Sequence, residues 1–295
     1  MLKLYSEILQ YLAEFRSYAL DDKVLDIRPA IEFVTFLTGN PEHIEQYYIS
    51  TLQSNPNEDF FLSHQANALA YALKIGRGLK YAPEKLHELG LAALHYDVGL
   101  LKIPDSIKYK EGELSDLELK TIQTHAEVGS IILSAYQEQY PFLSRAALEH
   151  HEREMGQGYP SGLKGNEISE YSKIIGVVDI YEAMIHKRPY RKAYLQHDSI
   201  KRILNSKGQL FPPYIIKAHL EETGLYPLGS YVKLNNGVTG RVCAVNKSHP
   251  LKPVVILLFD SNGLKMAGDS KINLGEHPIL YITEAIDMEN LPYSR

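Results

Sequence analysis

The stretch EHHEREMGQGYP, residues 149–160, places two adjacent histidines at the end of an apolar helical segment and follows them with a glycine-rich turn. Neighbouring helical residues point roughly 100° apart, so His150 and His151 can reach one centre only at a helix end or in an open pocket. Neutral imidazole is the commonest protein metal ligand, and glycine accepts positive φ without steric cost. The stretch therefore predicts a metal centre with the glycine turn folded over it.

Size and composition describe an ordinary globular chain. Its 295 residues suggest about two domains, and 44% of them are hydrophobic and 23% charged. A net charge of −5 argues against DNA as a partner, although a local basic patch for a phosphate ligand stays open. The single cysteine, Cys243, suits a reducing compartment. The N-terminus has no signal-peptide pattern, and no apolar run can span a bilayer. We expect a cytoplasmic protein without a membrane segment.

Outward from residues 149–160, four further titratable side chains stand on or at the end of apolar helical segments. One such group is usually a satisfied core residue, but six in one helical region are hard to explain independently, because each unpartnered buried polar group costs free energy. Convergence on metal explains all of them. Mixed histidine and carboxylate ligands in a helical bundle suit iron, manganese or another transition metal rather than calcium. The six expected metal ligands are His64, Asp97, His125, His150, His151 and Asp179.

The two ends of the chain carry no such cluster. The N-terminal segment repeats apolar side chains at helical spacing, which predicts a helical packing or partner-binding module. From Tyr226 onward, short apolar runs alternate with Asn-Gly turns, which predicts hairpins and a five-stranded barrel. The expected division is an N-terminal helical module over 1–57, the metal-site domain over 58–224, and a small all-β domain over 225–295.

The order of these motifs resembles the HD-GYP family, a branch of the HD-domain metal-dependent phosphohydrolases, over about residues 58–224. The strongest match, residues 150–160, is similar to the family signature HHExxDGxGYP. The resemblance implies an HD-domain helical bundle. With the flanking segments, the expected fold is mainly α, with this bundle between the N-terminal helical segment and the small C-terminal β-barrel domain. Supporting matches are Asp97-x-Gly99 followed by IPD at 103–105, HAExG at 125–129, and Asp179-x-Tyr181-x-Ala183 leading to RPYR at 188–191.

The resemblance also implies an activity. The family hydrolyses the bacterial messenger cyclic di-GMP to linear pGpG or GMP with a metal-activated water, at a site of two or three metal ions that is often occupied by iron. Two divalent ions are expected here, iron first, with manganese or another transition metal as the alternative. Carried over, His64, Asp97 and Asp179 would hold the first metal and His125, His150 and His151 the second, with Asp97 bridging.

Substrate contacts follow from the same resemblance. Arg188, Arg191 and Tyr159 would bind the phosphates or bases of the dinucleotide, and Asp97, Tyr159 and Arg188 would serve catalysis. Guanidinium groups bind phosphate in a bidentate manner, and a tyrosine beside a glycine turn can stack on a base. The alternatives are a solvated helix end for Arg188 and a structural turn role for Tyr159. The expected partners are cyclic di-GMP or a related cyclic dinucleotide, and a signalling protein.

Four positions depart from the family pattern. Tyr96 replaces the histidine of the His-Asp pair, and Leu100 replaces the lysine that follows three residues later. Phe60 stands where three-metal members carry glutamate, which favours two metals, and Met155 replaces the aspartate of the signature. A phenol has a pKa near 10, so Tyr96 would ligate only a strong Lewis acid. We expect a complete second metal site, a weakened first site and reduced activity. The alternative is a catalytically degenerate module that binds cyclic di-GMP or a protein and keeps the metal for structure.

Overall fold

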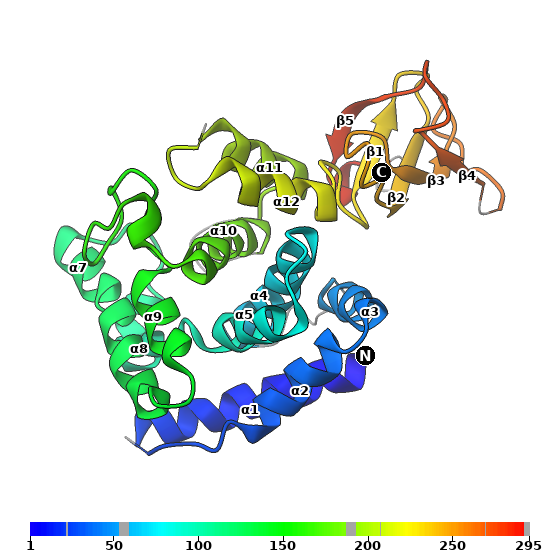
Figure 1. Cartoon of the computed structure of the whole chain (residues 1–295). Helices are drawn as coiled ribbons and strands as arrows, with labels where there is room; N and C mark the ends of the chain where they lie inside the picture. The colour runs from blue at the N-terminus through cyan, green and yellow to red at the C-terminus, as the bar shows by residue number, and fades with distance from the viewer. Residues whose placement is uncertain (22, 53–58, 187–192, 207, 269, 292–295) are drawn as a thin grey trace. The chain divides into compact units, whose positions relative to one another are not determined.

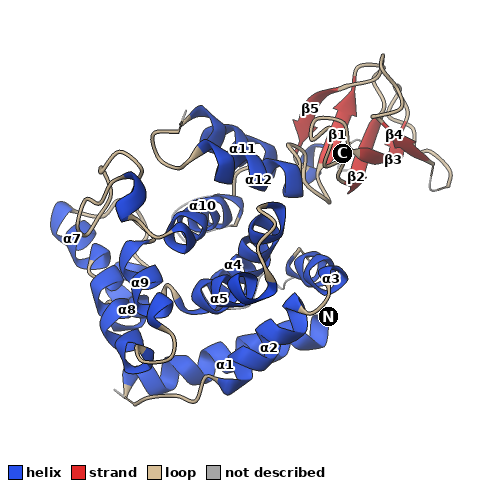
Figure 2. Cartoon of the chain, viewed as in Figure 1, coloured by secondary structure: helices blue, strands red, loops and turns tan. Residues whose placement is uncertain are grey.

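The computed structural model describes residues 1–21, 23–52, 59–186, 193–206, 208–268 and 270–291. The chain divides into two units, one of Met1–Lys192 with Ser206–Ile215 and one of Ala193–Asn205 with Ile216–Arg295. Helices build the first unit, and the described strands belong to the second (Figures 1 and 2). None of the helices in the described ranges has the length and apolar character needed to cross a membrane.

The first unit is organised around α4 (Phe60–Gly78), which is buried on every side from His64 to Gly76. Four alanines within that stretch give the helix a slim surface, so its neighbours approach closely. Both α5 (Pro83–His95) and α10 (Glu170–Ile185) pack against it. The remaining helices of this unit are α1 (Leu2–Leu20), α2 (Arg28–Thr38), α3 (Pro41–Thr51), α6 (Asp105–Lys108), α7 (Asp116–Gln123), α8 (His125–Leu133) and α9 (Pro141–Glu149), with the 3-10 turns η1 (Val98–Lys102), η2 (Ser134–Tyr136) and η3 (Gly165–Glu167).

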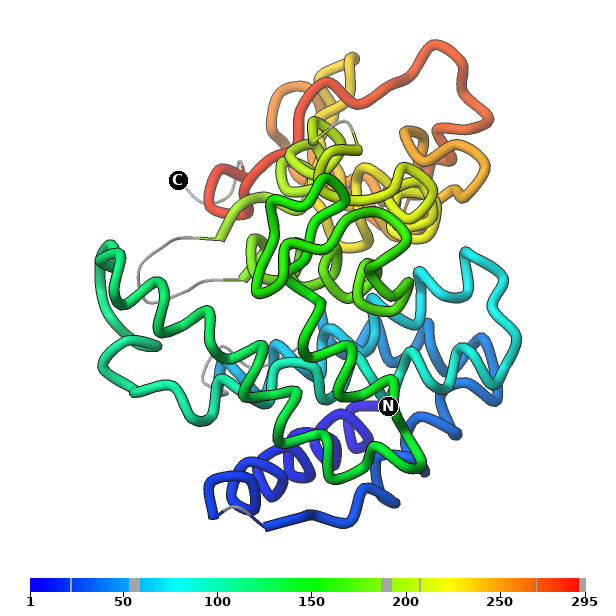
Figure 3. The backbone as a smooth tube through the Cα atoms, turned by 60° about the vertical axis from the view of Figure 1, so that its left-hand side comes forward, coloured from blue at the N-terminus to red at the C-terminus, as the bar shows by residue number. Residues whose placement is uncertain are grey.

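The N-terminal helices belong to the same unit as α4. The hydroxyl of Tyr5 in α1 donates to Asn67 Oδ1 at 3.0 Å, and that of Tyr47 in α3 donates to the Ala66 carbonyl at 3.0 Å. Two views show the N-terminal helices, in blue, along one side of the cyan and green helices (Figures 1 and 3). The expected boundary at residue 57 falls outside the described residues, so the three-part division stays a prediction.

Local signals set the helix ends that lead to the histidine pair. Ser115 caps α7, and its Oγ accepts from Glu118 N while the Glu118 carboxylate accepts from Ser115 N at 2.8 Å, which together form a capping box. Pro141 opens α9, where its fixed φ suits a first turn. The helix ends at Glu149 and leaves His150 as its C-cap. The histidine pair therefore stands at a helix end, as the sequence indicates.

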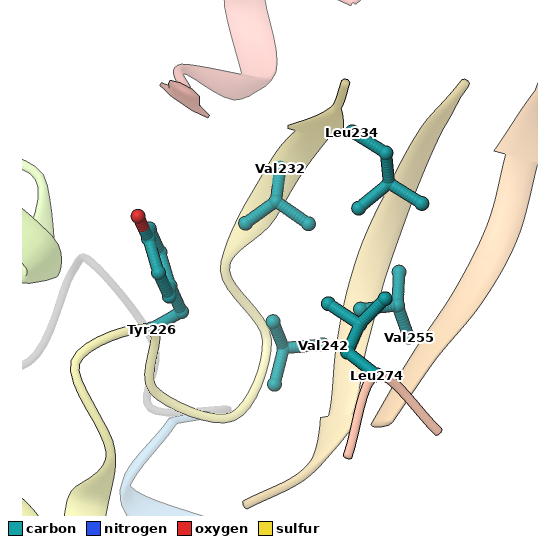
Figure 4. Close-up of a cluster of buried hydrophobic side chains, with 6 residues drawn as sticks. All are labelled: Tyr226, Val232, Leu234, Val242, Val255 and Leu274. Atoms are coloured by element: carbon teal, nitrogen blue, oxygen red, sulfur yellow. The ribbon is translucent and has the colours of Figure 1, made fainter. Parts of the chain in front are cut away.

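The second unit contains α11 (Gln196–Asn205), most of α12 (Pro213–Thr223) and an antiparallel sheet in the order β4-β3-β2-β1-β5. Side chains of one sheet face and its flanking turns meet in a small apolar core (Figure 4). The core residues are Tyr226, Val232, Leu234, Val242, Val255 and Leu274. The strands are β1 (Tyr231–Leu234), β2 (Thr239–Ala244), β3 (Val254–Phe259), β4 (Lys271–Asn273) and β5 (Ile282–Ile286), and the 3-10 turn η4 (Met288–Asn290) follows them.

The five expected strands are confirmed, but the expected barrel is wrong. Within the described ranges, β4 pairs with β3 and β5 pairs with β1, while β4 and β5 do not pair with each other. A barrel closes only when its two edge strands pair. The sheet is therefore open, with the three-residue β4 as one edge and β5 as the other.

Candidate metal centre

The six predicted ligands come together in the first unit, in two groups of three. Within each group, one candidate ligand atom per residue lies within 4.8 Å of the others. They are carried by α4, by the junction of α5 with η1, by the start of α8, by the end of α9 and by α10. We name His125, His150 and His151 the three-histidine group, and His64, Asp97 and Asp179 the mixed group.

The ring nitrogens of the three-histidine group face one another. His125 Nε2 lies 3.2 Å from His150 Nε2 and 3.1 Å from His151 Nε2. On the other side of two rings, His125 Nδ1 lies 2.6 Å from the Ile122 carbonyl and His150 Nδ1 lies 2.8 Å from the Ala147 carbonyl. A carbonyl only accepts, so Nδ1 carries the proton and Nε2 presents its lone pair. Two lone pairs at this separation repel unless a cation lies between them, and the donor set therefore fits a metal ion.

Burial keeps the imidazoles of His150 and His151 neutral. Desolvation, with the neighbouring His125, lowers the pKa of His150 to about 3. Desolvation, with the neighbouring His150, also holds the pKa of His151 well below its ordinary value. The cause is that a charged ring loses its hydration when it is buried. Neutral imidazole is the form that binds metal, so both rings are ready for a metal at neutral pH.

Gly99 brings Asp97 to the three-histidine group. The turn η1 passes so close to α8 that a Cβ on Gly99 would lie 1.9 Å from the His125 carbonyl oxygen and 2.5 Å from Gly129 N. Only glycine permits this approach. Asp97 Oδ1 consequently lies 3.4 Å from His125 Nε2 and 4.0 Å from His150 Nε2. Since Asp97 also belongs to the mixed group, its carboxylate lies close to candidate ligand atoms of both groups.

In the mixed group, side chains hold the ring of His64, whereas backbone carbonyls hold the rings of His125 and His150. Its Nδ1 makes a short contact with the Glu182 carboxylate. Its Nε2 lies 3.1 Å from Asp179 Oδ1 and 2.7 Å from the hydroxyl of Tyr96. The Tyr96 hydroxyl also donates to Asp179 Oδ1 at 3.3 Å, and the residue is fully buried. Tyr96 therefore occupies the same nitrogen and oxygen atoms that a metal in this group would use.

These partners also set the protonation of the mixed group. Burial alone would lower the pKa of His64, but the charge of Glu182 and the hydrogen bonds to Asp179 and Glu182 outweigh it and raise that pKa to about 10. Burial and the charges of Asp179 and Asp97 raise the pKa of Tyr96 well above its ordinary value. Without metal, His64 is thus a cation and Tyr96 a neutral phenol. A metal ion has to displace a proton to bind here.

Glu182, which the sequence reasoning missed, anchors His64. Its carboxylate accepts from Asn67 Nδ2 at 2.9 Å and pairs with His186 Nδ1 at 2.8 Å. Burial would raise the pKa of Glu182, but the facing His64 and His186 hold it below its ordinary value. A sequence signal for it exists, because Asp179 and Glu182 are three residues apart on one helix and share a face.

The glycine turn forms despite its departure from the family signature. The buried Glu152 carboxylate accepts from Ser161 N at 2.7 Å and from Leu163 N at 3.0 Å, which ties the two ends of the turn together. Gly156 has a φ of +79°, in the region that favours glycine. Met155, which stands in place of the aspartate, is 64% exposed. The turn therefore does not depend on the missing carboxylate.

A cavity of about 490 Å³ opens onto both groups, within the range of roughly 300–1,000 Å³ that is usual for small-molecule sites. The ring of Tyr159 stacks on His151, with centroids 4.5 Å apart. The ring of Phe60 stacks on the ring of His64, with centroids 5.8 Å apart. Arg188 and Arg191 lie outside the described residues. The other lining residues are Phe61, Asp97, Leu100, Lys108, Tyr109, Ile122, His125, Asp179, Ile180, Ala183 and Met184.

The first unit is therefore a helical domain in which histidine and aspartate side chains form two candidate metal sites beside one cavity. This arrangement is typical of helical metal-dependent proteins. The family model described as the HD domain matches residues 52–215, and the model described as a KOW domain associated with HD domain matches residues 231–293. The chain belongs to the HD-domain family.

Several named proteins are homologous to this chain. A cyclic di-GMP phosphodiesterase of Pseudomonas aeruginosa is 27% identical over 253 residues, which cover 86% of this chain and 61% of that protein. A 3'3'-cGAMP-specific phosphodiesterase of Vibrio cholerae is 37% identical over 184 residues, which cover 62% of this chain and 39% of that protein. A cyclic di-GMP phosphodiesterase of Thermotoga maritima is 36% identical over 137 residues, covering 45% and 37%. The chain thus spans less than two thirds of the length of each of these relatives.

The fold also has a solved counterpart. The structure of Bd1817, described as a HDG"Y"P protein from Bdellovibrio bacteriovorus, aligns with a TM-score of 0.55 at 15% sequence identity. The alignment covers 74% of this chain and 67% of that one. This likeness supports the HD-domain fold of the described helices.

Proposed function

We propose that this chain is a metal-dependent phosphodiesterase that hydrolyses a cyclic dinucleotide, cyclic di-GMP first, to pGpG or GMP. The observation that carries the proposal is the three-histidine group, in which two Nε2 lone pairs face each other at 3.2 Å with both Nδ1 protons tied to carbonyls. The homologous proteins are named as phosphodiesterases of cyclic di-GMP or 3'3'-cGAMP. This supports a cyclic dinucleotide as the substrate.

The three-histidine group with Asp97 would hold one divalent ion, iron first and manganese as the alternative. The mixed group would hold a second ion more weakly, because Tyr96 and a proton compete for His64 Nε2. When bound, such ions lower the pKa of a water and stabilise the charge that develops on the phosphodiester. Phe60 supplies no carboxylate, which favours two ions over three.

The other side chains of the cavity would bind and orient the dinucleotide. Its largely apolar walls exclude water around the reacting phosphate. The ring of Tyr159, which stacks on His151 and lines the cavity, would stack on a base. Arg188 and Arg191 would contact the phosphates, as guanidinium groups do. Asp97 would orient both ions through one carboxylate.

Turnover by the metal-loaded protein tests this proposal. Protein loaded with ferrous iron or manganese under reducing conditions is incubated with cyclic di-GMP and with 3'3'-cGAMP, and the products are separated by chromatography. We expect linear pGpG from cyclic di-GMP, and no product after chelation. Protein that carries metal and binds the intact dinucleotide without any hydrolysis would sink the enzyme proposal.

One observation favours a second function, in which the chain binds the dinucleotide or a signalling protein without turnover. Tyr96 places a neutral hydroxyl on the atoms of the first metal site, and Leu100 provides no charge beside it. In that case the metal stabilises the fold, so chelation lowers the melting temperature. The dinucleotide binds and is released without being hydrolysed. The turnover experiment separates the two functions.

A further inference from the structure

Leu100 leaves one wall of the cavity without positive charge, and the nearest lysine in the sequence does not supply it. Leu100 lines the cavity beside Asp97. Lys102 directs its ammonium to the carbonyl of Leu20 in α1, at 3.1 Å, and it is exposed. A cation that meets a substrate phosphate at this wall has to come from another element.

Lys108, the last residue of α6, is a buried lysine that lines the cavity. Its side chain is only 4% exposed and lines the cavity together with Asp97 and Leu100. Its Nζ lies 5.7 Å from the centre of the Phe61 ring. Among the described residues that line the cavity, Lys108 is the one lysine or arginine.

The ion pair of Lys108 does not account for this burial. Taking an ammonium out of water is costly unless a partner offsets the loss. The Nζ atom lies 2.8 Å from Asp105 Oδ1, but the Asp105 side chain is 72% exposed, and ion pairs with exposed carboxylates contribute little. An ammonium also has three donors. The pair with Asp105 therefore leaves capacity for an anion in the cavity.

The walls beside Lys108 suit a nucleotide. Phe61 and Tyr109 meet edge to face next to the ammonium, with ring centroids 5.3 Å apart, and both line the cavity. Aromatic faces stack on bases, and ammonium groups bind phosphate oxygens. The same cavity is lined by Asp97, one of the candidate metal ligands. A dinucleotide whose phosphate lies at that centre can place another part of itself against Lys108.

We propose that Lys108 binds a phosphate oxygen of the cyclic dinucleotide and supplies, from α6, the positive charge that Leu100 does not. This inference rests on the proposed function, and it adds a substrate-binding residue to it. It also explains how a phosphate site persists where the expected lysine is absent.

The test compares the effect of charge at two positions, 108 and 102. Lys108→Met removes the charge and keeps the length of the side chain, Lys108→Arg keeps a charge, and Lys102→Met is the matched control outside the cavity. We expect Lys108→Met to lower kcat/KM for cyclic di-GMP about 10- to 100-fold, the scale of a charged hydrogen bond, with metal content unchanged. Lys108→Arg should retain more activity, and Lys102→Met should stay within about twofold of the wild type.

A relocated charge makes the test sharper. In the Lys108→Met background, Leu100→Lys puts an ammonium back on the same cavity and should recover part of the lost kcat/KM. Wild-type kinetics in Lys108→Met would overturn the assignment and leave the proposed function standing. Loss in Lys108→Met that comes with equal loss of metal or melting temperature, and without rescue, would overturn it too.

Binding separates this inference from the failure of the proposed function. If the wild type does not hydrolyse cyclic di-GMP, titration calorimetry with cyclic di-GMP still compares wild type and Lys108→Met. A weaker dissociation constant, by about tenfold or more, supports Lys108 as a phosphate ligand without catalysis. Equal affinity, or no binding by the wild type, overturns it.

Discussion

The three-histidine group and the mixed group use the same kinds of ligand but differ in what holds their rings. Carbonyls of Ile122 and Ala147 hold His125 and His150, whereas the Glu182 carboxylate and the Tyr96 phenol hold His64. A carbonyl carries no charge and gives no proton, so it leaves Nε2 as a lone pair. The carboxylates favour a protonated ring. The expected order of metal affinity at the two sites therefore depends on the protein groups that hydrogen-bond to each imidazole, more than on the number of ligands.

The largest expected effect comes from breaking the three-histidine group. His150→Ala removes a ring that is fully buried, and we expect metal binding and cyclic di-GMP hydrolysis to fall by more than about 100-fold, beyond the 10- to 100-fold typical of outer partners. Metal analysis and product chromatography measure both. His277→Ala, an exposed histidine of the second unit, is the control. Full activity in His150→Ala would show that the two groups have been ranked in the wrong order.

Restoring the mixed group is expected to have the next largest effect. Tyr96→His replaces a competing hydroxyl by a ligand, so the metal content should rise toward two ions and the rate should rise about tenfold or more. Tyr96→Phe is the matched control, because it removes the hydroxyl from His64 without adding a ligand. The idea fails if both variants keep the metal content and the rate of the wild type.

Glu182→Gln sharpens the comparison within the mixed group. It removes the carboxylate that holds the His64 ring at Nδ1. Losing this orientation outweighs the easier deprotonation of a ring whose pKa Glu182 no longer raises, so we expect about tenfold weaker metal binding at this group and little change at the other. Glu127→Gln, an exposed carboxylate on α8, serves as the control. Competitive metal titration measures both affinities, and equal weakening at the two groups would contradict the assignment.

Acid and base should affect the metal-free protein through different rings. The pKa of His150 is lowered from 6.5 to about 3, so the unfolded state binds more protons between these values and stability falls as the pH drops through them. The pKa of His64 is raised from 6.5 to about 10, so its contribution is complete below pH 6.5 and is lost as the pH rises toward 10.

Urea unfolding of chelated protein at several pH values measures this smallest effect. Each ring contributes a slope of about 1.4 kcal/mol per pH unit within its own window. The His150→Ala variant should lose part of the acid slope, and His64→Ala part of the alkaline slope. An unchanged acid slope in His150→Ala would remove the basis for treating its ring as neutral.

Much of the fold could be predicted because its signals are local. The capping box of Ser115 and Glu118 and the proline at the start of α9 are decided by neighbouring residues. The direction of His95 also follows from local geometry, because neighbouring helical residues such as His95 and Tyr96 point roughly 100° apart. The structure has His95 Nε2 2.8 Å from the Tyr11 hydroxyl. Closure of the β-sheet was not predictable in this way, since it depends on whether two distant edge strands meet.

By itself the sequence determined which residues could bind metal, their order along the chain and the family they mark, because those properties reside in residue type and spacing. The tertiary structure decided how each ligand is used. It set Glu182 against His64 across 118 residues and Tyr96 against Asp179 across 83, and it brought Lys108 to the cavity wall. Protonation and charge at the centre depend on these long-range contacts, because burial and a facing charge shift a pKa and spacing does not.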